Sequence, residues 1–219
     1  TKFEVIFRPI SQDGLFSFFG LWDVYWYGII IATGFLLALI YAYFNYKRFG
    51  LNLDRALDVV LVTTPVAILC ARAFYVIFYG EKLESIGDFF GFGDSSGFAG
   101  LAIYGGVLGA IVGVAVFCKV KHIKLPMLLD LVSLGFLIGQ CLGRWGNFFN
   151  REAFGAETTS FLRMGLLNSY TRQVTYYHPT FLYESVWNFA GFLLLHHLSK
   201  KRQYDGQIAL GYAAWYGLG

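Results

Sequence analysis

The sequence predicts an all-α polytopic membrane protein with about six transmembrane helices. Hydrophobic residues make up 57% of its 219 residues, and charged residues make up 14%, compared with about 25% in soluble domains. Mean hydropathy is +0.54, and apolar runs of roughly 20 residues, long enough to cross a bilayer as helices, recur along the chain. We therefore expect a single membrane-embedded domain over residues 1–219.

The expected elements follow in order. Residues 1–20 mix charged and aromatic side chains and turn at the SQDG sequence, which is typical of a segment lying on the membrane surface. An aromatic belt from Trp22 opens the first helix, which extends to about Phe44. Residues 151–178 form a polar head segment between the fourth and fifth helices. The later helices are expected at 59–79, 101–118, 126–150 and 179–198, and from 206 onward.

Basic residues are distributed unevenly among the loops. Nine of the 17 lysines and arginines lie in the three short loops after the first, third and fifth expected helices. Cytoplasmic loops of membrane proteins are enriched in these residues. The N-terminus and the head segment should therefore lie on the extracytoplasmic side.

The composition also excludes several classes of function. The net charge of +3 is small and dispersed, which argues against a nucleic-acid-binding surface. Cys70, Cys118 and Cys141 lie in apolar runs without paired spacing, which argues against a disulfide framework and a zinc site. We expect no metal and no cofactor.

The GRWGNFFNREAFG sequence, residues 143–155, places polar groups at the end of the fourth expected helix. Gln140, Arg144, Asn147 and Arg151 recur at spacings of four, three and four, so they share one helical face. A snorkelling arginine at the membrane boundary would explain Arg144 alone. Beside this face runs a glycine stripe that allows another helix or a lipid headgroup to approach closely. The stripe consists of Gly135, Gly139, Gly143 and Gly146.

Four ionisable residues fall within the expected helices, where a charge costs at least about 2.5 kcal/mol. Asp130 lies near the cytoplasmic end of its helix, where the helix dipole and nearby water favour a structural carboxylate. Arg72 could pair with an acid or bind phosphate. Glu184 requires a partner, and an arginine at the outer level is expected. The fourth residue is Arg144.

Glycines recur along the third expected helix. Gly105, Gly109 and Gly113 form a small-residue ladder that predicts close helix packing. Gly105 and Gly106 directly follow Tyr104, and such a pair can expose backbone amides to an anion.

Together these groups predict a pocket for an anionic lipid headgroup at the outer level of the membrane. Guanidinium groups bind phosphate bidentately, and asparagine and tyrosine can orient ester or glycerol oxygens without adding a charge. The chain has no H-E-x-x-H sequence and no cysteine–histidine nucleophile, so a reaction here would take its nucleophile from a substrate. The pocket residues are Tyr27, Tyr104, Arg144, Asn147, Glu152, Tyr183 and Glu184.

Residues 143–155 match the pattern Gly-Arg-x-Gly-Asn-Phe-x-Asn-x-Glu-x-x-Gly. With this motif, the chain resembles the prolipoprotein diacylglyceryl transferases of bacterial plasma membranes. The resemblance extends over essentially the whole chain, with the matching residues in the same order. The resemblance implies a seventh helix beyond Gly219. It is supported by Tyr27, Gly28, Ala71, Arg72, Tyr104, Gly105, Gly106, His178, Pro179, Leu182, Tyr183 and Glu184.

This resemblance implies transfer of the diacylglyceryl group from phosphatidylglycerol to the lipobox cysteine thiol of a prolipoprotein, releasing glycerol phosphate. The implied partners are phosphatidylglycerol, lipobox-containing signal peptides and membrane lipid. We expect a monomer that binds no nucleic acid and spans the bacterial inner membrane several times, with the motif on the extracytoplasmic side.

We expect Arg144 to stabilise the leaving phosphate and Asn147 to hold the headgroup. The thiol, with a pKa near about 8.5, must lose its proton to attack carbon. Many family members have histidine where this chain has Tyr104, and a phenol with a pKa near about 10 is largely protonated, so Glu152 or Glu184 is the preferred base. The catalytic candidates are Arg144, Asn147, Glu152, Tyr104 and Tyr27. The substrate-binding candidates are Arg144, Asn147, Arg72, Gly105, Gly106, Gly155, His178, Tyr183 and Glu184.

A small-anion transporter or channel is the alternative, because it would use the same arginines and glycine-rich helices. Transport requires charged groups along a path through the membrane, whereas the candidate cluster lies at one face. A scaffold subunit is a third interpretation, and it leaves the arginines within the helices without a purpose.

Overall fold

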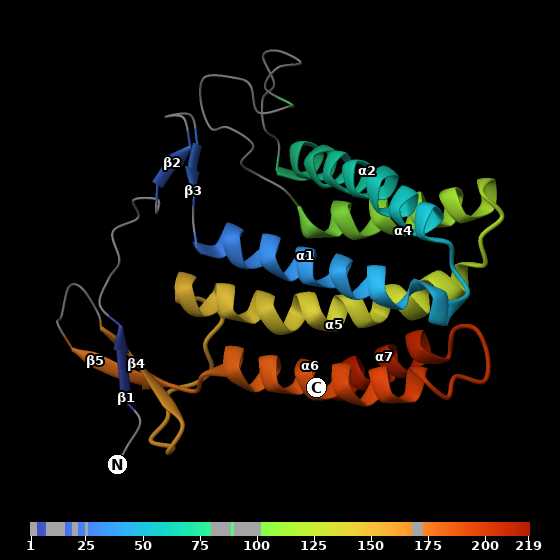
Figure 1. Cartoon of the computed structure of the whole chain (residues 1–219). Coiled ribbons are helices and arrows are strands. Elements are labelled where there is room, and N and C mark those ends of the chain that lie inside the picture. Colours follow the sequence, from blue (N-terminus) through green and yellow to red (C-terminus); the bar gives the residue numbers. More distant parts are fainter. Residues whose placement is uncertain are drawn as a thin grey trace. The chain divides into compact units, whose positions relative to one another are not determined.

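The computed structural model describes residues 4–7, 16–18, 22–24, 26–79, 89, 102–167 and 173–219. It is mostly helical (Figure 1) and divides into two compact units, Thr1–Asn45 with Asp130–Gly219, and Tyr46–Leu129. The elements are β1 (Glu4–Phe7), β2 (Phe16–Phe18), β3 (Trp22–Val24), α1 (Trp26–Asn45), η1 (Tyr46–Phe49), α2 (Leu53–Tyr79), α4 (Ile103–Val120), α5 (Leu125–Asn150), β4 (Arg163–Leu167), β5 (Val174–Tyr177), α6 (Thr180–Ser199) and α7 (Gln207–Leu218).

Four helices of the described residues, α1, α2, α4 and α5, are long and apolar enough to cross a membrane. This supports a membrane protein with several spans. Two of the six expected spans, α6 and α7, do not meet the same criteria. α6 contains Glu184, Asn188 and two histidines near its end, and α7 has 12 residues within this chain.

The segment between α5 and α6 contains β-structure, so the expectation of an all-α protein was wrong for this part. β4 pairs with β5 in antiparallel orientation and with β1 in parallel orientation. β1 belongs to the expected surface segment 1–20, most of which lies outside the described residues. The β1–β4 pairing joins strands more than 150 residues apart, and local sequence patterns carry no information on such distant partners.

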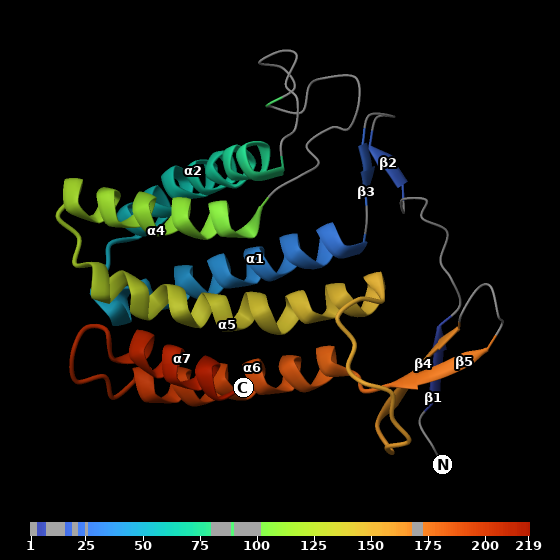
Figure 2. The ribbon, with the colours of Figure 1, turned by 180° about the vertical axis from the view of Figure 1, so that it is seen from behind.

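α1 and α5 lie side by side in both views of the ribbon (Figures 1 and 2), and the glycine stripe explains how closely they pack. A Cβ atom added to Gly34 would lie 3.5 Å from the Cα of Gly139, and one added to Gly135 would lie 3.5 Å from the Cβ of Ala38. The close approach of another helix, expected from the stripe, is confirmed, and the partner is α1.

Asp130 of α5 caps the N-terminus of α7. Its side chain is fully buried. Oδ2 accepts hydrogen bonds of 2.8 Å from Arg202 Nη1 and from the Gly206 amide, while Oδ1 accepts bonds of 2.9 Å from the amides of Ile208 and Ala209. Gly206, the residue before α7, has no side chain for capping. Asp130 is therefore structural. The helix whose N-terminus stabilises its carboxylate is α7 rather than its own helix α5, and water does not reach the buried side chain.

Two tryptophans join α6 to α7. The rings of Trp187 and Trp215 stack with centroids 4.3 Å apart and an interplanar angle of 17°. Each indole N–H donates to the backbone carbonyl of the other residue, over 3.3 and 3.1 Å. Both ring nitrogens are thereby satisfied at a helix interface where an unpaired donor would be costly.

Candidate functional site

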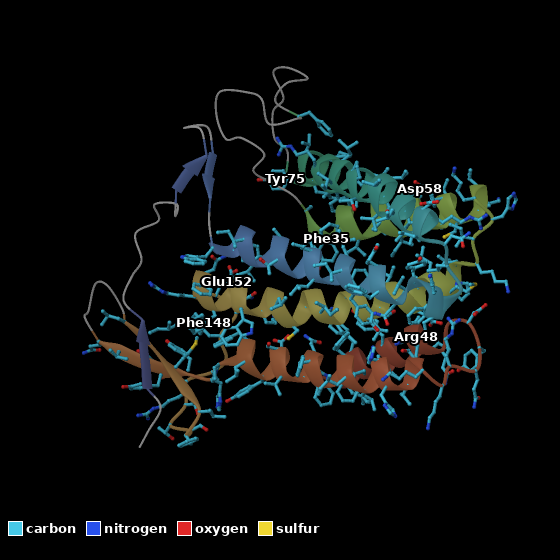
Figure 3. All side chains as sticks on the ribbon, in the orientation of Figure 1. Phe35, Arg48, Asp58, Tyr75, Phe148 and Glu152 are labelled. Carbon is cyan, nitrogen blue, oxygen red and sulfur yellow. The ribbon has the colours of Figure 1, made fainter. Side chains whose placement is uncertain are left out.

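The polar motif lies at the end of α5, where the helix stops. Arg151 and Ala153 both have positive φ angles, of 55° and 52°, which turn the chain away from the helix axis. The Glu152 amide donates to the Asn147 carbonyl over 3.1 Å and closes the last turn. Figure 3 shows Phe148 and Glu152 together at this end of α5.

Arg144 of α5 forms an ion pair with Glu184 of α6 through Nη2 and Oε2. The outer arginine expected as the partner of Glu184 is therefore found, and it is Arg144. The two side chains are 31% and 40% exposed, so both can reach a ligand from outside. The pair supplies a cationic fork and a carboxylate at one place, which suits binding of a phosphate near a proton acceptor.

Ser185 fixes α6 against α5 next to this ion pair. Its hydroxyl donates to the Cys141 carbonyl over 2.9 Å and accepts from the Trp145 indole over 3.1 Å. Ser185 follows Glu184 and Trp145 follows Arg144, so these two bonds hold the helix register in which the charged residues meet. Sequence reasoning missed Ser185, and its only signal was a small polar residue beside Glu184.

Tyr27 of α1 packs against the motif. A Cβ atom added to Gly146 would lie 2.6 Å from Cδ2 and 2.8 Å from Cε2 of the Tyr27 ring. The neighbouring Trp26 stacks on Phe149, with centroids 5.4 Å apart. Gly146 therefore provides the space for the Tyr27 ring at this end of α5.

Gly155, His178 and Tyr183 form a second cluster at the start of α6. The Gly155 amide donates to the His178 carbonyl over 3.0 Å, and His178 Nδ1 shares a hydrogen bond of 3.1 Å with the Tyr183 hydroxyl. A Cβ atom at Gly155 would lie 2.9 Å from the His178 Cβ, so this position requires close approach. These contacts tie the segment after the motif to the first turn of α6, which carries Glu184.

Glu152 and Arg151 occupy different surroundings. Glu152 is exposed, and its Oε1 accepts a hydrogen bond of 3.1 Å from the Asn150 amide group. Partial burial lowers the pKa of the Arg151 guanidinium, because desolvation disfavours the charged form. Glu152 is thus the carboxylate of the motif that solvent and a ligand can reach.

Four of the expected site residues belong to the other compact unit. Arg72 is almost fully buried on α2, donates from Nε to the Phe89 carbonyl over 3.1 Å and lies over the Tyr75 ring. Tyr104 is 73% exposed at the start of α4. The Gly106 amide donates to the Ala102 carbonyl within the helix. Gly105 packs against the backbone of α2 at Cys70, so helix packing explains this glycine.

The described residues contain no group of three or more histidine, cysteine, aspartate or glutamate side chains able to hold a metal ion.

Fold and site together define a helical membrane protein with an arginine–carboxylate cluster at the end of one apolar helix. The family model described as prolipoprotein diacylglyceryl transferase matches residues 13–219. The chain belongs to this family.

Three relatives of the chain are named as diacylglyceryl transferases, in agreement with the family model. The chain is 42% identical over 211 residues to a phosphatidylglycerol–prolipoprotein diacylglyceryl transferase of Bacillus cytotoxicus. It is 42% and 41% identical, over 210 residues each, to proteins of the same name from Bacillus cereus and Bacillus mycoides. Each match covers 91% of this chain and 75% of the relative.

Proposed function

We propose that this protein transfers the diacylglyceryl group of phosphatidylglycerol to the lipobox cysteine of prolipoproteins. Membership of the family and the names of its relatives support this activity. The structural observation that carries it is the ion pair of Arg144 and Glu184, a partly exposed cation and carboxylate beside the family motif.

The reaction joins the cysteine sulfur to the terminal glycerol carbon. A base takes the thiol proton, the thiolate attacks carbon to form a thioether, and the carbon–oxygen bond to phosphate breaks. Its electron pair leaves with glycerol phosphate. The leaving group gains negative charge as the bond breaks, so a positioned cation lowers the barrier.

Arg144 is the cation that stabilises the leaving phosphate in this proposal, and Asn147, one turn further along the same face, holds the headgroup. The Tyr27 ring, packed on Gly146, borders the same space. Gly155, His178 and Tyr183 support the segment after the motif.

Glu152 is the preferred proton acceptor. Protonation of Glu184 would give up its ion pair with Arg144, whereas Glu152 is exposed and accepts a hydrogen bond from the neutral Asn150 amide. Arg72, Tyr104, Gly105 and Gly106 are proposed to contribute to lipid binding.

The protein is proposed to lie in the bacterial plasma membrane as a monomer, with six spans in this chain and the motif on the extracytoplasmic side. The positive-inside distribution supports this orientation. Prolipoproteins are membrane-anchored by their signal peptides, so lipid and peptide would both reach the site from the bilayer.

The proposal is tested by measuring whether a lipobox peptide gains a diacylglyceryl group. Protein purified from membranes should add a diacylglyceryl group to the peptide in phosphatidylglycerol micelles, as read by mass spectrometry. A peptide whose only cysteine is replaced by serine is the control. An unchanged cysteine peptide, with a known enzyme active in parallel, would contradict the proposal.

A further inference from the structure

Gln140 and Tyr212 form a polar pair within the helices, one turn from Arg144. Gln140 Nε2 donates to the Tyr212 hydroxyl over 2.9 Å. Gln140 precedes Arg144 by four residues on the same face of α5, a rise of about 6 Å. The pair therefore lies beside the phosphate position proposed for Arg144, further along the helix toward its start.

The amide oxygen of Gln140 is buried and has no hydrogen-bond partner among the described residues. Exchanging the amide oxygen and nitrogen would leave the nitrogen unpartnered instead, so one polar atom stays unsatisfied in either orientation. Buried polar atoms in native proteins nearly always have a partner. Within a bilayer, bulk water does not replace one. The unsatisfied side-chain oxygen of Gln140 therefore indicates that a polar group of a ligand binds beside it.

The pair offers one acceptor and one donor to that group. Tyr212 accepts the bond from Gln140 through its oxygen, which leaves its own O–H proton to donate. The free Gln140 oxygen accepts. A hydroxyl both donates and accepts, so it satisfies both atoms at once. An ester carbonyl can only accept, and an ammonium group can only donate.

We propose that Gln140 and Tyr212 form a subsite for a hydroxyl of the glycerol headgroup of phosphatidylglycerol. The inference rests on the proposed function, which places the lipid phosphate at Arg144. The headgroup hydroxyls are a few bonds from that phosphate, which agrees with the spacing of one helical turn. Phosphatidic acid carries the phosphate without this glycerol, so the subsite distinguishes the two lipids.

The experiment compares the two lipids on the purified protein. Gln140→Met keeps the side-chain length and removes both polar atoms, and Tyr212→Phe removes the hydroxyl. Tyr204→Phe, in the exposed connection before α7, is the matched control. The transfer assay gives KM and kcat for phosphatidylglycerol, and inhibition by phosphatidic acid gives the affinity for a lipid without the headgroup glycerol.

We expect both subsite variants to raise the KM for phosphatidylglycerol about tenfold, equivalent to about 1.4 kcal/mol, with kcat and inhibition by phosphatidic acid within about twofold of the unmodified protein. Equal losses for both lipids would overturn the subsite, because they would indicate a general packing defect. An unchanged KM would overturn it as well.

The proposed function can fail separately. If the unmodified protein transfers nothing, lipid binding is read by native mass spectrometry with phosphatidylglycerol and phosphatidic acid. A preference for phosphatidylglycerol that both variants abolish supports the subsite without the enzyme activity. Equal binding of the two lipids to the unmodified protein overturns it.

Discussion

Glu184 of α6 forms an ion pair with Arg144 of α5, and each residue is directly followed by one that bonds the two helices together. Ser185 and Trp145 share a hydrogen bond of 3.1 Å immediately beside the charges. The charged pair and its support therefore use two consecutive residues on each helix. This gives the site a rigid base although its charged groups are partly exposed.

Replacing Arg144 with alanine should abolish transfer, because the leaving phosphate would lose the guanidinium fork held beside Glu184. Arg144→Lys keeps the charge and loses the bidentate geometry, so it should retain a small fraction of kcat. Initial rates with the lipobox peptide measure both. Wild-type rates in Arg144→Ala would contradict the assignment.

Ser185→Ala should lower activity about tenfold or more. The change removes both hydrogen bonds that the Ser185 hydroxyl makes between α6 and α5, and a bond of this kind contributes about 0.5–1.5 kcal/mol. Ser185→Thr keeps the hydroxyl and should recover much of the rate. Ser199→Ala, at a buried serine that bonds the His196 carbonyl within α6, is the control and should stay near wild type in kcat.

Asp130→Asn should strongly lower the unfolding temperature in detergent. Breaking a buried charge pair by altering one partner costs about 3–5 kcal/mol, and the carboxylate also caps α7. Asp205→Asn is a matched control, since Asp205 pairs with the same Arg202 over 3.3 Å but is more exposed. It should cost less than about 1 kcal/mol. Equal shifts in both variants would refute the capping role.

Gly146→Ala should reduce transfer, because the new Cβ atom would overlap the Tyr27 ring. Gly139→Ala adds the same atom to the same stripe with no atom within 4 Å, so its activity should be unchanged and its helix slightly more stable. Rates and unfolding temperatures measured side by side separate displacement of Tyr27 from a general effect on α5.

Tyr104→Phe should weaken transfer without abolishing it. Tyr104 is highly exposed at the start of α4, and a protonated phenol orients a ligand by hydrogen bonding more readily than it removes a proton. The pH dependence of kcat should keep its shape in this variant. Complete loss of transfer in a folded protein would assign the proton transfer to tyrosine.

The helices could be predicted from the sequence because each is encoded by a contiguous apolar run. The expected start of the second helix, at residue 59, was late by two turns, since α2 begins at Leu53. Its first turns carry Asp54, Arg55 and Asp58, which obscure the apolar pattern. The strands were missed because each has only three to five residues, too few for a clear alternating pattern, and one of their pairings, β1 with β4, joins residues distant in sequence.

In the candidate site, too, features carried by one helix could be predicted, whereas contacts between helices could not. The stripe of Arg144 and Asn147 was visible because one helix carries it. The glycine stripe predicted a close partner, but only the structure identifies α1. There Tyr27, Ile31, Gly34 and Ala38 recur at spacings of three or four residues and face Gly146, Gly143, Gly139 and Gly135 in turn.

The tryptophan pair of α6 and α7 also makes helix docking optically visible. Two indoles stacked 4.3 Å apart couple their electronic transitions, so the folded protein should show a paired circular-dichroism band near the indole absorption. Because each ring is held by the other residue's backbone, separating the helices would remove this signal. The chain thus contains an intrinsic probe of whether α7 is in place.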